Sequence, residues 1–180
     1  MDRDNNKAKT LAEVAGAVQE TDLSPFEKRD MTSAIKRIGE MAGIALATVP
    51  AEAPALRAMV AEIRPAAHGV SEKTWANLLS RFRAALRLAN VIDPIVQGSA
   101  MRDPAWAPLV EAISEDKRLS CGLASFFNWC ASQAIAPEAV SDAVVQRFHH
   151  WLENRTLCRK PRDVVRRVPN LWNEMSKETK

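Results

Sequence analysis

The sequence predicts an all-α protein made of two small helical bundles in tandem, on three observations. Apolar residues recur mostly three and four positions apart, which is the spacing of amphipathic helices. Glycine occurs only 6 times in 180 residues, while alanine, leucine and arginine are abundant. The stretch VIDPIVQGSAMRDPAW, residues 91–106, holds two prolines and a glycine and predicts a connection between two halves.

These observations also divide the chain into parts. Residues 1–22 should form a flexible N-terminal segment, 23–92 an N-terminal bundle, 93–104 a linker and 105–176 a second helical bundle. With 47% hydrophobic and 26% charged residues, the composition is that of an ordinary soluble globular protein. A chain of this length can bury about 70% of its unfolded surface, which suffices for one domain or two small ones.

The first strong helix start is the sequence SPFE. Ser24 suits the N-cap, Pro25 suits the first helical position, and Glu27 can close a capping box. The helix should end near Gly43. Upstream, KTLAEVAGAVQE, residues 9–20, has only a weak helical stripe, so it stays within the flexible segment.

Two further helices complete the N-terminal bundle. One should follow Pro54 and stop at Pro65, because a proline inside a helix removes a backbone hydrogen bond and clashes with the preceding turn. The next should begin near Ser71. Its apolar residues share helical spacing and are Trp75, Leu78, Leu79, Phe82, Leu86 and Ala89.

In the second half of the chain, the apolar spacing and the prolines predict four helices. A short one should span residues 104–115, and a longer one carrying Leu123, Phe126, Phe127 and Cys130 should end before Pro137. A third should present Val140, Val144, Phe148, Trp151 and Leu152 on one face. The last should begin at Pro161, and Pro169 should kink it or end its regular part.

The two halves share a pattern. Residues 76–89 superpose on residues 162–175 without gaps, and the apolar positions coincide. This spacing indicates either an internal duplication or a chance likeness between two amphipathic helices. Both interpretations give two bundles rather than a solenoid of many repeats.

The sequence lacks the patterns of known catalytic sites. It contains no GxSxG, P-loop, GxGxxG or HExxH motif. His149 and His150 are adjacent, so on a helix their rings diverge by about 100° and cannot chelate one metal. We expect one at the edge of the core and one in solvent. We therefore expect no catalytic residue, no metal and no cofactor.

The three cysteines are an odd number without CxxC spacing, which argues against a disulfide framework or a zinc site. Cys121 and Cys130 should fill the core, and Cys158 should be a loop thiol. Trp75 and Trp106 stand near helix starts, where an indole can pack inward or meet a partner. The N-terminus has no secretory signal and no stretch is long enough to span a bilayer, so we expect a cytoplasmic protein.

The basic residues carry the strongest functional signal. The formal net charge is only +3, but residues 155–167 hold six basic residues against the single acid Asp163. The main cluster comprises Arg155, Arg159, Lys160, Arg162, Arg166 and Arg167. A second set, on the helix after Ser71, comprises Arg81, Arg83 and Arg87. Cations at a helix start form a good phosphate-binding arrangement, whereas the alternative is a solvated helix face.

Three stretches resemble the N-terminal region of phage-type tyrosine recombinases, the site-specific integrases. They are SEKTWANLLSRFRAALRLANV (71–91), LASFFNWCASQAIAPEAVSDAVVQRFHHWLE (123–153) and PRDVVRRVPNLWNEM (161–175). The likeness covers roughly residues 20 to 176 and is one of helices and turns rather than catalytic motifs. It implies the family's core-binding domain, a SAM-like helical bundle that holds duplex DNA against a separate catalytic domain.

The catalytic residues of that family are missing from this chain. The family's catalytic domain supplies a tyrosine nucleophile and an His-x-x-Arg element, but the chain has no tyrosine and none of its three histidines has arginine three positions later. We therefore expect the chain not to be an enzyme by itself, but a fragment or short relative of a recombinase.

The expected function is DNA binding in integration and recombination. Double-stranded DNA is the expected partner, with further protomers on the same DNA, with no membrane and no small-molecule substrate, and with a nucleoid location when DNA is bound. The alternative is a helical protein-interaction module that docks an acidic partner through the same basic faces.

Overall fold

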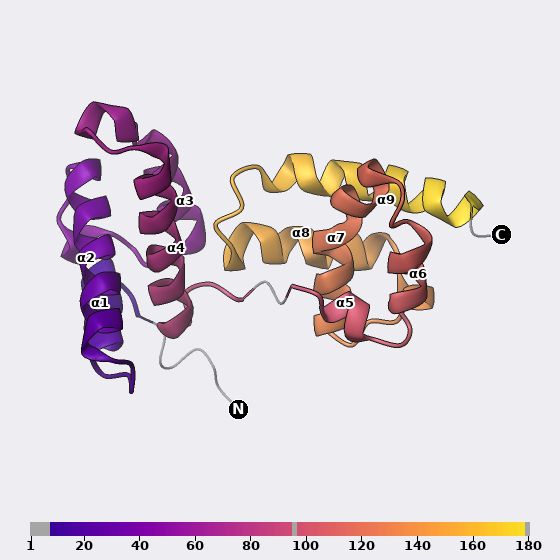
Figure 1. The fold of residues 1–180 in the computed structure, drawn as a ribbon, viewed down its shortest axis with the longest axis horizontal. Helices are drawn as coiled ribbons and strands as arrows, with labels where there is room; N and C mark the ends of the chain where they lie inside the picture. Colours follow the sequence, from indigo (N-terminus) through magenta and orange to yellow (C-terminus); the bar gives the residue numbers. More distant parts are fainter. Residues whose placement is uncertain (1–7, 95–96, 179–180) are drawn as a thin grey trace. The chain divides into compact units, whose positions relative to one another are not determined.

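The computed structural model describes residues 8–94 and 97–178, and over those residues it is all-helical (Figure 1). Its only extended pairing there is an isolated bridge between Thr10 and Pro50. The α-helices are α1 (Leu11–Gln19), α2 (Pro25–Ala42), α3 (Ala53–Glu62), α4 (Glu72–Leu88), α5 (Ser99–Arg102), α6 (Ala107–Ala112), α7 (Lys117–Ser132), α8 (Asp142–Arg155) and α9 (Pro161–Glu178). Short 3-10 turns are η2 (Leu46–Thr48), η3 (Pro65–His68) and η4 (Pro137–Ala139).

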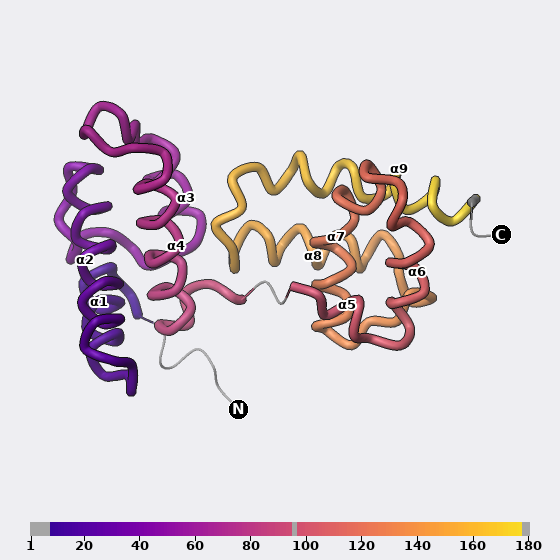
Figure 2. Tube along the Cα trace, viewed as in Figure 1, coloured from indigo at the N-terminus to yellow at the C-terminus, as the bar shows by residue number. Residues whose placement is uncertain are grey.

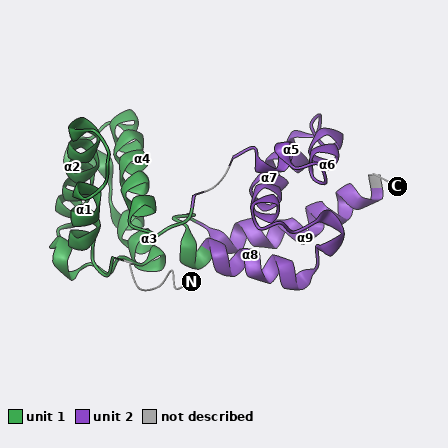
Figure 3. Ribbon diagram, turned by 90° about the horizontal axis from the view of Figure 1, so that it is seen from below, with its two compact units in different colours: residues 1–93, 153–159 green, residues 94–152, 160–180 purple. Residues whose placement is uncertain are grey.

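The chain divides into two compact units (Figure 3). Unit 1 comprises residues 1–93 together with 153–159, and unit 2 comprises residues 94–152 and 160–180. The sequence prediction had a linker at 93–104, whereas unit 2 begins at Pro94 and already contains α5. The return of 153–159 to unit 1 was not predicted, because nothing in the local sequence signals it.

In unit 1, helices α1, α2 and α4 pack against one another. The predicted start of α2 is confirmed: the Ser24 hydroxyl accepts the backbone N–H of Glu27, and the Glu27 carboxylate accepts the N–H of Ser24. Gly43 ends the helix in the left-handed conformation, with φ of 68°. Ser71 caps α4 by accepting the N–H of Thr74.

Residues 1–22 were expected to form a flexible segment, but the structure has helix α1 over Leu11–Gln19. Thr10 caps it, and Leu11, Val14 and Val18 are fully buried in the core of unit 1. Three large side chains at this spacing bury enough apolar surface to hold a short helix on its neighbours. Residues 1–7 lie outside the described residues.

The segment 153–159 is attached to unit 1 by specific polar contacts. The Arg57 guanidinium donates to the carbonyl oxygens of Glu153 at 2.7 Å and Thr156 at 2.9 Å. Arg155 contacts one Asp93 carboxylate oxygen at 2.6 and 3.1 Å, and the Asp93 N–H donates back to the Arg155 carbonyl. Leu157 packs against the same hydrophobic core.

In unit 2, α7 is the central helix, and both α5 and α9 pack against it. The tube in Figure 2 shows how α7 and α9 approach each other. Trp106, whose environment the sequence left open, is fully buried and donates its indole N–H to the Ile135 carbonyl at 2.8 Å. It belongs to an aromatic cluster formed by Trp106, Phe126, Phe127, Trp129, Phe148, Trp151 and Trp172.

Two boundaries differ from the sequence predictions, and at Pro169, where a kink or an end was predicted, the structure excludes the end. Helix α9 continues through Pro169, because a proline removes one helical hydrogen bond while Val168, Leu171 and Met175 stay buried on both sides of it. Residues 99–102, predicted as connection, form α5. Helix α6 is shorter than the predicted span of 104–115.

Over residues 8–94 and 97–178, none of the helices combines the length and the apolar character that crossing a bilayer requires.

Candidate functional site

Unit 2 carries an open groove of about 820 Å³ between the start of α7 and the middle of α9. We call it the α7–α9 groove. It is lined by Lys117, Arg118, Cys121, Gly122, Arg166, Arg167, Asn170 and Leu171. Four of these eight residues are cationic, so the groove concentrates positive charge that the net charge of the chain does not reveal.

Helices α7 and α9 each contribute two neighbouring cations to the groove, and the local sequence fixes where these residues lie on each helix. Arg166 and Arg167 are exposed on α9, and the next residue, Val168, is fully buried and fixes the orientation of the helix. Lys117 and Arg118 are the first residues of α7, directly after its N-cap. Gly122 lets α9 come close, since a Cβ at this position would collide with the Leu171 side chain.

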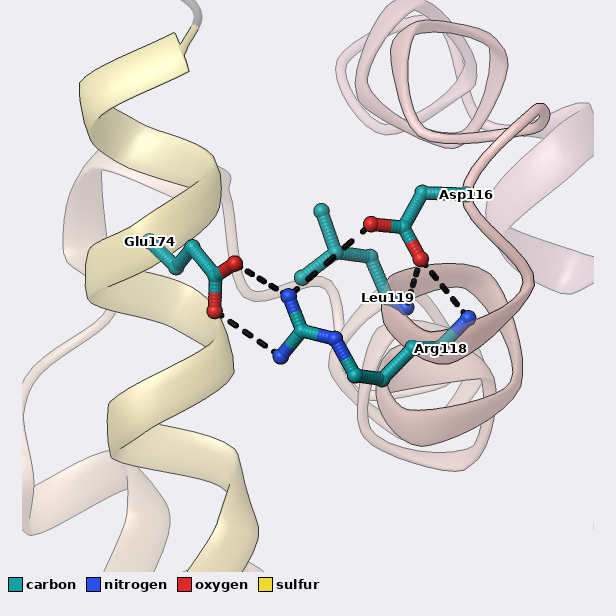
Figure 4. A network of polar contacts seen from close by, with 4 residues as sticks. All are labelled: Asp116, Arg118, Leu119 and Glu174. Atoms are coloured by element: carbon teal, nitrogen blue, oxygen red, sulfur yellow. Dashed lines mark hydrogen bonds and ion pairs between the residues drawn. The ribbon is translucent and has the colours of Figure 1, made fainter.

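Arg118 is held in place by acids on both sides (Figure 4). Its two terminal nitrogens bind the two carboxylate oxygens of Glu174 on α9, and one of them lies 3.9 Å from Asp116. The hydrogen bond from Arg118 holds the pKa of Glu174 below its ordinary value of 4.5. The pKa of Asp116 is also lowered, chiefly because its carboxylate accepts the backbone N–H of Leu119.

The other three cations of the groove are available to a ligand. Lys117, Arg166 and Arg167 form no ion pair among the residues that the structure describes, and all three are exposed. The Asn170 amide adds a neutral donor and acceptor between them. The groove can therefore bind an anion with several oxygens without first breaking an ion pair of these three side chains.

The remaining members of the predicted main cluster have other environments. Lys160 stands 3.9 Å from Asp163, and Arg162 is exposed near the start of α9. Arg155 and Arg159 belong to unit 1 rather than unit 2, and Arg155 is paired with Asp93. The structure thus places Arg166 and Arg167 beside α7 in unit 2. It places Arg155 and Arg159 in unit 1, so the predicted cluster is divided between the two units.

The predicted second set lies on α4 in unit 1 and is less available. Arg81 forms an ion pair with Asp30 of α2 at 2.8 Å. Arg83 is half-buried, and its pKa is lowered first by desolvation and then by the nearby charge of Arg87. Arg87 is exposed.

Sequence reasoning missed Lys117 and Arg118, since an N-cap aspartate stands beside them and makes the local charge look balanced. It was also wrong about Cys121, which is exposed in the groove, because its position on α7 faces α9 across a gap rather than the core. Cys130 is buried as predicted, and desolvation raises the pKa of its thiol to about 12.

The histidines have the exposures that were predicted: His149 is partly buried and His150 is exposed. Across the described part of the chain, no group of three or more His, Cys, Asp or Glu side chains is placed to hold a metal ion.

No protein-family model, curated protein or solved structure matches this chain significantly. Its function has to be inferred from the residues of the groove and from the motifs in the sequence.

Proposed function

We propose that this chain is a non-catalytic, DNA-binding part of a tyrosine-recombinase-like integrase, and that the α7–α9 groove contacts the phosphate backbone of duplex DNA. The observation that carries the proposal is the convergence of Lys117, Arg166 and Arg167 on one groove without an ion pair among the described residues. These cations come from two helices far apart in sequence, and their proximity leaves like charges side by side that a phosphate would neutralise.

The chemistry of the groove suits phosphate better than a single carboxylate. Arginine presents a planar fork of donors that matches two phosphate oxygens, and lysine adds a compact charge. Arg118 is fixed by Glu174, so it lines the groove in one orientation and offers it less net charge. Contacts of this kind hold a duplex in place and supply salt-dependent affinity, whereas they carry no base sequence information.

The family part of the proposal is supported by the motifs at 71–91, 123–153 and 161–175 and by the position of the groove on the last of them. The chain contains no tyrosine, so it cannot itself form a phosphotyrosyl bond to DNA. In this proposal it positions the duplex, and another polypeptide segment supplies the strand cleavage.

The test is a salt titration of binding to a labelled generic duplex, followed by fluorescence anisotropy. The wild-type protein should give a log–log slope of about −4 or steeper, which implies roughly five phosphates neutralised. The Arg166→Ala/Arg167→Ala variant should flatten the slope by about 1.8, at about 0.9 for each phosphate that is no longer neutralised. It should keep the wild-type melting temperature, since both side chains are exposed.

A matched control is Arg64→Ala/Lys73→Ala, which removes the same charge from exposed positions outside the groove and should leave the slope close to wild type. Cys121 gives a second readout, because DNA in the groove should slow its alkylation while Cys158 is unaffected. Binding that is weak and independent of salt would contradict the proposal. A tight complex with an acidic protein, with no affinity for DNA, would favour the interaction module.

A further inference from the structure

A second open groove, of about 650 Å³, lies in unit 1 along α2 beside the end of α1. We call it the α2 groove. The residues that matter for its chemistry are Lys28, Arg29, Thr32, Ser33, Lys36 and Arg37. It contains none of the cations singled out from the sequence, and it lies on a different helix from Arg81, Arg83 and Arg87.

The groove is held in shape by hydrogen bonds between the two helices. The Gln19 side-chain amide donates to the Thr32 hydroxyl at 2.7 Å, and the Lys28 ammonium donates to the Gln19 carbonyl at 2.8 Å. The capping box at Ser24 fixes the start of α2. The backbone of α2 that carries the groove is therefore held in place, and the side chains of Lys28 and Thr32 are already ordered without a ligand.

Charge is distributed unevenly along the groove. Arg29 pairs with the neighbouring Asp30 at 3.4 Å and lies over the Phe26 ring. Lys36 and Arg37 are exposed and form no ion pair in the described ranges 8–94 and 97–178. Glu40 is the acid among the lining residues, against four cations.

We infer that the α2 groove is a second site for the phosphate backbone of a nucleic acid. Two pairs of cations stand two helical turns apart, about 12 Å along the axis, with Thr32 and Ser33 between them. The side chains of lysine, arginine, serine and threonine are among the usual donors to phosphate oxygens.

Phe26, at the same end of α2 as Arg29, is 70% exposed. An exposed aromatic ring beside arginine offers a stacking surface to a sugar or base, which favours nucleic acid over an acidic polypeptide.

This site is independent of the α7–α9 groove, since all its residues belong to unit 1. The experiment uses the full chain, the same labelled duplex and the same salt titration, with the variant Lys36→Ala/Arg37→Ala. The log–log slope should flatten by about 1.8 relative to wild type, while Arg64→Ala/Lys73→Ala leaves it unchanged. The melting temperature of Lys36→Ala/Arg37→Ala should equal that of wild type. The variant Lys36→Gln/Arg37→Gln, which also removes both charges, should give the same flattened slope.

When one duplex contacts both grooves, combining the two pairs of changes should flatten the slope by the sum of the separate effects, because the slope counts the phosphates neutralised in that complex. If only Arg166→Ala/Arg167→Ala changes the slope, the α2 groove is not a nucleic-acid site and the proposed function stands. If only Lys36→Ala/Arg37→Ala changes it, the α2 groove is supported and the α7–α9 groove is not. Polyglutamate serves as a probe for an acidic polypeptide. If Lys36→Ala/Arg37→Ala keeps the wild-type slope with DNA but no longer binds polyglutamate, the inference is overturned in favour of an acidic protein.

Discussion

At the scale of single residues, the partner of each arginine decides its role. Arg166 faces an open groove, whereas Arg118 on the opposite wall is bound by Glu174. Arg57 donates to two backbone carbonyls and stabilises the chain path. Arginine content in a sequence therefore measures the supply of cations but not how many of them a ligand can reach.

The Arg118–Glu174 pair should make stability depend on pH. Because the folded pKa of Glu174 is lowered, its stabilising effect is present above the ordinary value of 4.5 and is lost as pH falls through the lower, folded value. Glu174→Gln should melt below wild type near neutral pH. The difference should shrink as pH falls below the ordinary value of 4.5. Melting curves across this range would check it, with Glu115→Gln as the control. A difference that stays constant with pH would contradict the assignment.

At the scale of elements, close helix contact shapes the α7–α9 groove. Gly122 stands where α9 approaches α7, and Leu171 occupies the space that a side chain at 122 would need. Gly16 on α1 has no neighbour in the corresponding direction. The same residue type is thus a packing requirement in one helix and has no packing role in another.

Gly122→Val should lower the free energy of unfolding by about 1–3 kcal/mol, the usual effect of overpacking a filled site. Gly16→Val makes the same change in helix propensity without a clash, so it should be neutral or slightly stabilising. Chemical denaturation of both variants would measure the difference. Equal stability of the two would mean that Leu171 moves aside freely and that Gly122 does not set the helix distance.

At the scale of the whole molecule, the chain forms two units but not in simple succession. Residues 153–159 belong to unit 1, although the residues before and after them belong to unit 2. Arg57, the Arg155–Asp93 pair and the packing of Leu157 attach this segment. Arg155 and Arg159 therefore belong to unit 1, whereas the cations of α9 belong to unit 2.

Arg57→Met should loosen the 153–159 segment, because it keeps the aliphatic stem but removes donors to the carbonyls of Glu153 and Thr156. The expected loss of stability is about 1–3 kcal/mol for polar groups left without their donor. Hydrogen exchange of residues 153–159 should become faster, while the exposed control Arg64→Ala leaves it unchanged. Unchanged exchange in Arg57→Met would show that Leu157 and Asp93 suffice to hold the segment.

Much of the fold could be predicted because its signals are local. Capping by Ser24 and Ser71 and the apolar spacing of α4 and α7 act within a few residues, and all appear in the structure. The errors arose where burial depends on distant residues. Helix α1 needs its neighbours in unit 1, and Cys121 is exposed although it lies on an apolar helix. At Pro169, where the sequence predicted a kink or an end, α9 does not end, because its apolar face is packed on both sides of the proline.

The candidate site was only partly predictable for the same reason. The sequence by itself determined an all-helical chain, the starts of its main helices and the presence of Arg166 and Arg167 on an amphipathic helix. Only the tertiary structure decided that Lys117 joins them, that Arg118 is bound by Glu174, and that Lys36 and Arg37 line a groove of their own. Charge acts across space and not along the chain, so the grouping of cations follows from helix packing.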